Sequence, residues 1–173
     1  RRGGRIYDEM QAANDSHRRS QQALTEIRSG IYLTGLCIRD YLLDPSHLST
    51  ERYRSQFAEV HASTVQYLEQ LRKPARPEET LAFEALRAEM ESYFALLAPV
   101  FEWTPQQKVL LSPRFLREEV LTSRNSVMAM ALEVRELNRA HFARQREDLA
   151  RAQRSFQTYL NRMTVLVLFL GTM

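Results

Sequence analysis

The chain has 173 residues, of which 44% are hydrophobic and 26% charged, enough for one domain with its own core. Its 5 glycines and 6 prolines are few, which is typical of long helices joined by short turns. The net charge is only +3, and acidic residues interrupt the series of arginines, which argues against a nucleic-acid-binding surface. The single cysteine, Cys37, excludes an intrachain disulfide and a cysteine-based metal site, and we expect a small core residue there.

The first helix is predicted from about Arg5 to Leu43. Its apolar seam follows heptad steps of three and four residues: Met10, Ala13, His17, Ser20, Leu24, Ile27, Ile31, Thr34, Ile38 and Tyr41. Such a seam is typical of coiled-coil-like packing in a bundle. Asp44-Pro45 should end this helix, because the residue before a proline is steered away from the helical region.

A second apolar stripe lies on the opposite face of this helix. It consists of Leu33, Leu36 and Leu43, with Asp40 completing the spacing. A helix that is apolar on two faces is expected to be buried on both. The stripe predicts a homodimer through the first helix, and the alternative is that the connection around Trp103 covers it within one chain. Gly30 and Gly35 each cost about 1 kcal/mol relative to alanine inside a helix, and close approach at the dimer contact would explain them.

Two shorter helices follow. Ser49 or Thr50 should begin the second, which ends at Lys73-Pro74, and Pro77 should lie in the first turn of the third. Their seams are Tyr53, Phe57, Val60, Thr64, Tyr67 and Leu71 in one, and Phe83, Leu86, Met90, Tyr93, Leu97 and Val100 in the other.

Residues 100–112 form the least regular connection. Thr104-Pro105 is predicted to start a short helix, and Ser112-Pro113 to cap the fourth long helix. The only tryptophan, Trp103, lies here. It is expected to close the end of the bundle, and the alternative is that it contacts a ligand.

The fourth helix should run from Pro113 to the end of the chain. Its seam is Leu116, Val120, Ser123, Val127, Met130, Val134, Leu137 and His141. The next apolar series, which starts at Leu149, is four residues out of step. An insertion of four residues is a stutter, which locally unwinds a supercoil.

Residues 163–173 contain no charge, and they are about half as long as the roughly 20 apolar residues that a membrane span requires. We expect 1–162 to be the bundle domain and 163–173 the start of a transmembrane helix in a segment of a longer protein. The alternative is a soluble helix end that packs on a neighbour.

Together these segments predict an all-α, antiparallel up-down-up-down four-helix bundle. The second and third helices have about 24 residues each, roughly 36 Å at 1.5 Å per residue. The first and fourth are much longer, so their surplus ends should form a two-helix, membrane-proximal stalk, the shape of a transmission device.

Enzyme motifs are not found in the sequence. None of the four histidines has a glutamate three residues before it, as di-iron bundle enzymes require, and no phosphate-binding loop or zinc-protease motif occurs. No catalytic residue, metal or cofactor is predicted. His17 and His141 both lie on seams and could form a pH-sensitive polar core layer, although separately buried histidines are the favoured interpretation.

The stretch from Leu24 to Pro45, which ends in Arg39-Asp-Tyr-Leu-Leu43 before a proline turn, and the following Tyr53-Arg-Ser-Gln-Phe57 carry a resemblance. They resemble the first helix and turn of the four-helix-bundle sensor domains of bacterial histidine kinases and chemoreceptors. The resemblance implies a homodimer, transmembrane helices before Arg1 and near Met163, and cytoplasmic signalling modules after Met173.

In that family, some members bind small molecules between subunits through arginines of the first helix and polar groups of the fourth. By position, the resemblance implies Arg28 and Arg39 on the first helix and Arg124 and Asn125 on the fourth as ligand-binding residues. Arginine's planar fork suits carboxylates. The alternative for each is a solvated bundle surface.

We therefore expect an extracytoplasmic, periplasmic sensor domain of a two-component histidine kinase in the bacterial inner membrane. It would relay a stimulus across the membrane by helix displacement and would not itself be an enzyme. The alternatives are a chemoreceptor ligand-binding domain and a soluble helical adaptor.

Overall fold

The computed structural model describes the backbone of residues 2–46, 49–71 and 77–171. Side-chain burial is described between 7 and 158, apart from 47–48, 72–76, 78, 152–153 and 156–157. All regular elements in these ranges are helical. They are α1 (Arg2–Leu43), α2 (Thr50–Gln70), α3 (Pro77–Leu97), the 3₁₀ helix η2 (Ala98–Glu102), α4 (Pro105–Arg114), the π-helix η3 (Phe115–Val120) and α5 (Leu121–Gly171).

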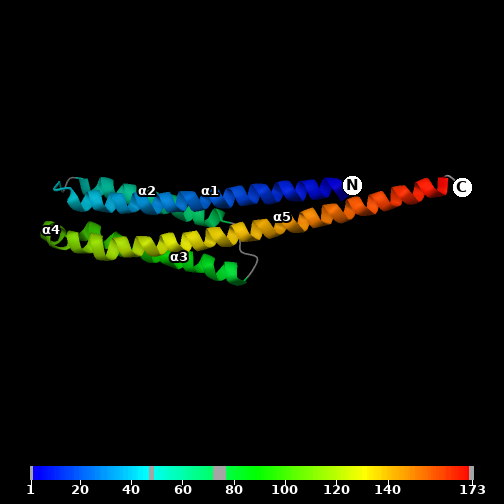
Figure 1. Ribbon diagram of the computed structural model, residues 1–173. Helices are drawn as coiled ribbons and strands as arrows, with labels where there is room; N and C mark the ends of the chain where they lie inside the picture. Colours follow the sequence, from blue (N-terminus) through cyan, green and yellow to red (C-terminus); the bar gives the residue numbers. More distant parts are fainter. Residues whose placement is uncertain (1, 47–48, 72–76, 172–173) are drawn as a thin grey trace. The chain divides into compact units, whose positions relative to one another are not determined.

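The chain forms two compact units. One comprises Arg19–Leu137, and the other comprises Arg1–Arg18 together with Asn138–Met173. Within residues 19–137, α1, α2, α3 and α5 pack side by side and antiparallel (Figure 1). The predicted all-α four-helix fold with long first and last helices is therefore confirmed.

The core of the bundle follows the predicted seams. On α1 the buried seam residues of the bundle are Ser20, Leu24, Ile27, Ile31, Thr34, Ile38 and Tyr41, and Ala13 is buried in the other unit. Met10 and His17, at the start of the seam, are only half-buried. Cys37 is buried, and its thiol lies 3.6 Å from the carbonyl oxygen of Tyr53, so the expected core position of this cysteine is confirmed.

Gly30 and Gly35 on α1 serve contacts inside the chain. A Cβ at Gly30 would overlap with the side chain of Thr64 on α2, and one at Gly35 would lie 3.3 Å from the hydroxyl oxygen of Tyr93 on α3. The proposal that a dimer contact explains these glycines was wrong. The close neighbours of Gly30 and Gly35 are the second and third helices of the same bundle.

In the turn after α1, Ser49 bonds to a side chain of the turn and does not cap the next helix. α1 ends at Leu43, as Asp44-Pro45 predicted, and α2 begins at Thr50 with Ser49 at the capping position. Ser49 makes no capping hydrogen bond to α2. Its hydroxyl instead donates to the Asp44 carboxylate at 2.6 Å, because that charged acceptor lies close to it across the turn. The expected end of α2 at Lys73-Pro74 lies outside the described residues.

The helical run that ends in α5 begins at Pro105 with α4, earlier than the predicted start at Pro113. Thr104 caps α4 through a capping box with Gln107. Pro113 lies inside α4, and Ser112 donates its hydroxyl to the Lys108 carbonyl, so the predicted cap at Ser112-Pro113 was wrong. Proline lacks the N–H of a regular helical bond. The chain continues through the wider π-helical segment η3 into α5, which keeps its direction despite that missing donor.

The seam of α5 changes phase only after His141. Val134, Leu137 and His141 are covered and keep the heptad steps of three and four. Leu149, where the next apolar series starts, lies eight residues after His141, so the shift is one residue beyond a heptad and the predicted insertion of four was wrong. The boundary between the units falls earlier, between Leu137 and Asn138.

The second unit contains residues 2–18 of α1 and 138–171 of α5. Within it, the rings of His17 and Phe142 stack with centroids 4.1 Å apart and planes at 6°. Within the described ranges, no helix contains a stretch long and apolar enough to cross a bilayer. The backbone is helical to Gly171, but the side chains of the uncharged run 163–173 lie outside the described residues, so its membrane role stays a prediction.

Candidate functional site

The five residues that the sequence predicts to bind a ligand differ in exposure and in their neighbours. Arg28 and Asn125 are exposed, and Arg39 is paired with its neighbour Asp40 at 2.6 Å. Arg124 is half-buried beside Tyr93, whose pKa is raised by burial, an effect that the positive charge of Arg124 opposes. Their role in binding stays a prediction.

Trp103 packs within the bundle. Its ring meets that of Phe115 edge to face, with centroids 5.1 Å apart, and it is half-buried. The connection around Trp103 does not cover the apolar stripe of α1. In that stripe Leu33 is 47% exposed, Leu43 is 67% exposed and Leu36 is half-buried. The alternative that this connection covers the stripe within one chain was wrong, and the homodimer through Leu33, Leu36 and Leu43 stays a prediction.

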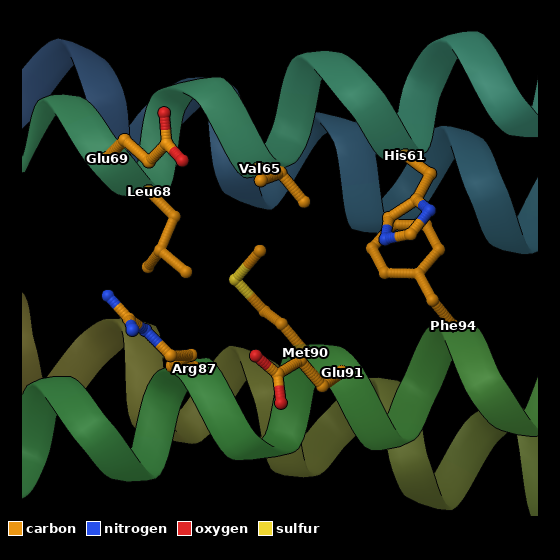
Figure 2. Close-up of a pocket in the computed structure, with 8 residues that line it drawn as sticks. All are labelled: His61, Val65, Leu68, Glu69, Arg87, Met90, Glu91 and Phe94. Carbon is orange, nitrogen blue, oxygen red and sulfur yellow. The ribbon is translucent and has the colours of Figure 1, made fainter.

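The structure contains a pocket that the sequence did not indicate, between α2 and α3 (Figure 2). Its volume is about 180 Å³. Four side chains from one face of each helix line it: His61, Val65, Leu68 and Glu69 from α2, and Arg87, Met90, Glu91 and Phe94 from α3. The helical spacing of three and four residues places each set on one face.

The middle of the pocket is apolar. Leu68 and Met90 are buried at its base, and Val65 is 37% exposed above them. In Figure 2 these three side chains point toward one another from the two helices. An apolar base open to solvent can bury the hydrocarbon part of a small molecule.

An aromatic pair forms one end. The rings of His61 and Phe94 stack with centroids 4.2 Å apart, and Phe57 supports both, at 6.4 Å from His61 and 5.7 Å from Phe94. Since His61 and Phe94 lie on different helices, this stack fixes one end of the pocket across the α2–α3 interface (Figure 2).

Three charged side chains line the rest. Glu69 and Arg87 lie at the end away from His61, and Glu91 lies beside Met90 (Figure 2). The Arg87 guanidinium is also 5.2 Å from the ring centroid of Phe83. With two carboxylates and one guanidinium, the charged lining carries an excess of one negative charge.

A buried lysine forms a second polar centre, which we call the Lys108 cluster: Tyr41, Asp44, Ser46, Ser49 and Lys108. The Lys108 side chain is 5% exposed, and its ammonium donates to the Asp44 carbonyl at 3.1 Å and lies 3.9 Å from the centroid of the Tyr41 ring. Burial lowers the pKa of Lys108, and the negative charge of Asp44 opposes that effect. The cluster fastens α4 to the end of α1.

The Asp44 carboxylate anchors the turn of this cluster. It accepts the Ser49 hydroxyl at 2.6 Å and the Ser46 N–H at 2.8 Å. These hydrogen bonds, that of Ser49 foremost, hold the pKa of Asp44 below its ordinary value. Such an arrangement positions backbone rather than reacting groups.

In the part of the chain that the structure describes, no three histidine, cysteine or carboxylate side chains are grouped to hold a metal ion. The α2–α3 pocket is the candidate binding site. Sequence reasoning missed it because its residues, apart from the seam residue Met90, flank the heptad seams and become neighbours only once α2 and α3 are paired.

The chain was compared with models of known protein families, with curated proteins and with solved structures, and none of them matches it. What the fold itself defines is an all-helical four-helix domain whose first and last helices are long.

Proposed function

We propose that this chain is an extracytoplasmic sensor domain of a membrane-bound two-component histidine kinase, and that it relays a stimulus as a small helix displacement. One observation carries the proposal: α1 and α5 each contribute to both compact units, whereas α2, α3 and α4 belong to the bundle alone. A shift of α1 or α5 in the bundle is therefore passed by a continuous helix to the other unit.

The packing supports transmission by rigid helices. Close-packed cores switch between discrete arrangements rather than deforming smoothly, and helix shifts of about 1–2 Å are typical of such transitions. The core of the bundle includes fully buried Ile27 and Ile31 on α1 and Val127 on α5. The seam of α5 changes phase between His141 and Leu149, so a displacement that reaches this segment can pass from one face of the helix to another.

Dimerisation and membrane attachment complete the proposal. The exposed Leu33 and Leu43, with half-buried Leu36, give α1 an apolar face that a second copy would cover. The uncharged run 163–173 would continue into a membrane-spanning helix in the intact protein. A chemoreceptor would use the same bundle with a different cytoplasmic output, and assay of phosphoryl transfer separates the two.

Cysteine labelling in whole cells tests the location. Cys37 is buried and burial raises the pKa of its thiol, so it should react slowly with maleimides. Ser55 on α2 is exposed, and the intact protein with Ser55→Cys should gain one site for a membrane-impermeant maleimide added outside the cytoplasmic membrane. Labelling of Ser55→Cys only after the membrane is broken would overturn the extracytoplasmic placement.

A further inference from the structure

The two compact units of the chain differ in charge. The unit formed by residues 1–18 and 138–173 contains ten arginines and five acidic residues, an excess of five positive charges. Residues 19–137 contain 14 basic and 16 acidic residues, an excess of two negative charges. The chain therefore combines a weakly acidic bundle with a basic unit. That basic unit includes the segment of α5 that leads into the uncharged run 163–173.

The arginines of this α5 segment gather on one side of the helix. At 3.6 residues per turn, or about 100° per residue, five of them fall within an arc of about 160°. All five side chains are exposed. The partly covered positions of the segment lie outside this arc, among them Leu149 and Phe142, whose ring stacks on that of His17. We call the five residues the arginine face: Arg139, Arg144, Arg146, Arg151 and Arg154.

The acidic residues beside the arginine face neutralise only part of it. Glu147 and Asp148 both pair with Arg151, at 2.6 and 3.7 Å. Arg154 makes one hydrogen bond to a backbone carbonyl of its own helix, at 3.4 Å. Among the described residues, no carboxylate forms an ion pair with Arg144 or Arg154. The face thus presents exposed guanidinium groups that an anionic partner can reach.

The C-terminal end of the arginine face lies close to the uncharged run. The backbone of α5 is helical through Gly171. Arg154 precedes Met163 by nine residues, about 14 Å along the helix, and Arg144 precedes it by 19 residues, about 29 Å. The headgroup layer adds about 5–7 Å to each side of the hydrocarbon core, and the Debye length at physiological salt is about 8 Å. Where the run enters a bilayer at Met163, Arg154 is therefore within reach of the lipid phosphates and Arg144 is not.

We propose that the arginine face binds an anionic lipid surface through its C-terminal end, with Arg154 at the phosphate headgroups. Arginine suits this partner because its planar guanidinium can bond two phosphate oxygens at once. A nucleic acid would instead engage the whole face and would gain nothing from the uncharged run beside it. The contact would hold the end of α5 at the membrane surface, so the anionic lipid content would act on the helix that the proposed function requires to move.

Vesicle binding of the 173-residue chain tests the proposal. Vesicles of phosphatidylcholine are compared with vesicles that also contain phosphatidylglycerol, and bound protein is separated by flotation. The chain should bind the anionic vesicles at least about fivefold more tightly at physiological salt, the effect of one basic residue near such a surface. At about 1 M salt, where the Debye length is about 3 Å, the difference should disappear.

The two kinds of vesicle also separate this inference from the membrane attachment in the proposed function, on which it rests. Binding to the neutral vesicles reports attachment through the uncharged run 163–173. The difference between neutral and anionic vesicles reports the arginine face.

Single substitutions locate the contact. Arg154→Gln should weaken binding to the anionic vesicles about three- to fivefold. Arg144→Gln, ten residues further from the uncharged run on the same face, should change it by less than about 1.5-fold, because screening removes its effect at that distance. Arg117→Gln removes the same charge from an exposed position of η3 in the bundle and is the matched control, with no expected effect. All three positions are exposed, so the fold should be retained.

Three results would overturn the proposal. They are equal affinity for neutral and anionic vesicles, an equal loss of binding in Arg154→Gln and Arg144→Gln, and tighter binding to a DNA duplex than to anionic vesicles at matched phosphate concentration.

Discussion

Gly30 on α1 and Thr64 on α2 lie so close that a Cβ at position 30 would overlap with the Thr64 hydroxyl oxygen. Both residues are buried, and the Thr64 hydroxyl is held by a hydrogen bond to the Val60 carbonyl at 2.7 Å. The Thr64 Cβ itself would be 3.4 Å from the added atom, an ordinary contact. The hydroxyl, and not the helix backbone, therefore decides that position 30 is glycine.

This relationship predicts the outcome of a double-mutant cycle. Gly30→Ala should destabilise the bundle by about 1–3 kcal/mol, as expected for overpacking of a filled core. In a Thr64→Ala background the same change should cost little or should stabilise, because alanine is favoured over glycine in a helix by about 1 kcal/mol. Urea unfolding of the four proteins measures the coupling. Additive effects would show that the two residues do not contact each other.

The heptad seams show how much of the fold could be predicted from the sequence. The spacing that runs from Leu24 to Tyr41 predicted the buried face of α1, because a heptad seam is a local property of one helix. The partners across the seam are not local. Gly30 gave no sign that Thr64 was its neighbour, and its presence was attributed to a dimer contact.

Lys108 is predicted to stabilise the contact between α4 and the end of α1. Lys108→Met keeps an unbranched apolar side chain but removes the donor to the Asp44 carbonyl and the charge over the Tyr41 ring. The loss should be about 1–2 kcal/mol, since the cost of burying the lysine offsets part of its contacts. Thermal unfolding measures it. Gln106→Met, at an exposed position of the same helix, is the control and should change stability by less than about 0.5 kcal/mol.

We predict that acid weakens the turn that Asp44 stabilises after α1. Because its pKa in the folded chain is below the ordinary value of 3.8, the unfolded chain binds this proton more tightly. The stabilisation from Asp44 is thus complete above pH 3.8 and is lost as the pH falls below it. The stability difference between the wild-type chain and Asp44→Asn should therefore shrink as the pH is lowered from 5 to 2. A difference that stays constant over this range would contradict the prediction.

We predict that His17 resists protonation, and that low pH destabilises the unit that contains it. Burial foremost, and the positive charge of Arg139 next, hold its pKa below the ordinary value of 6.5. The folded unit therefore binds the proton less tightly than the unfolded chain, and it loses stability as the pH falls below 6.5.

An NMR titration of the His17 ring measures this pKa directly. Phe142→Ala should raise it by exposing the ring to water, and Arg139→Gln should raise it by removing a positive charge. A wild-type pKa at or above 6.5 would be incompatible with this account. The predicted polar layer of His17 with His141 remains to be tested by His141→Leu, which should alter the His17 titration if the two histidines share a layer.

The features that the sequence did not predict have physical reasons. Lys108 lies in an irregular stretch where a lysine is expected to be solvated, and only the fold of α4 onto α1 buries it. Pro113 usually marks a helix start, but here the π-helical segment η3 allows the helix to continue past it. The α2–α3 pocket depends on the register of two helices, which no single-helix pattern contains.

A deletion at the phase change tests the central claim that α5 carries movement from the bundle to the other unit. Removing Phe142 alone, directly after His141, would place Leu149 seven residues after His141 and restore a continuous heptad seam. Removing 142–148 takes out one whole heptad and keeps the phase change. Both deletions remove Phe142, so its stack with His17 is lost in each.

Autophosphorylation of the intact protein in its membrane is the measurement. We predict that the one-residue deletion fixes autophosphorylation at one level, high or low, regardless of stimulus, while the seven-residue deletion still responds. An unaltered response after the one-residue deletion would contradict the account.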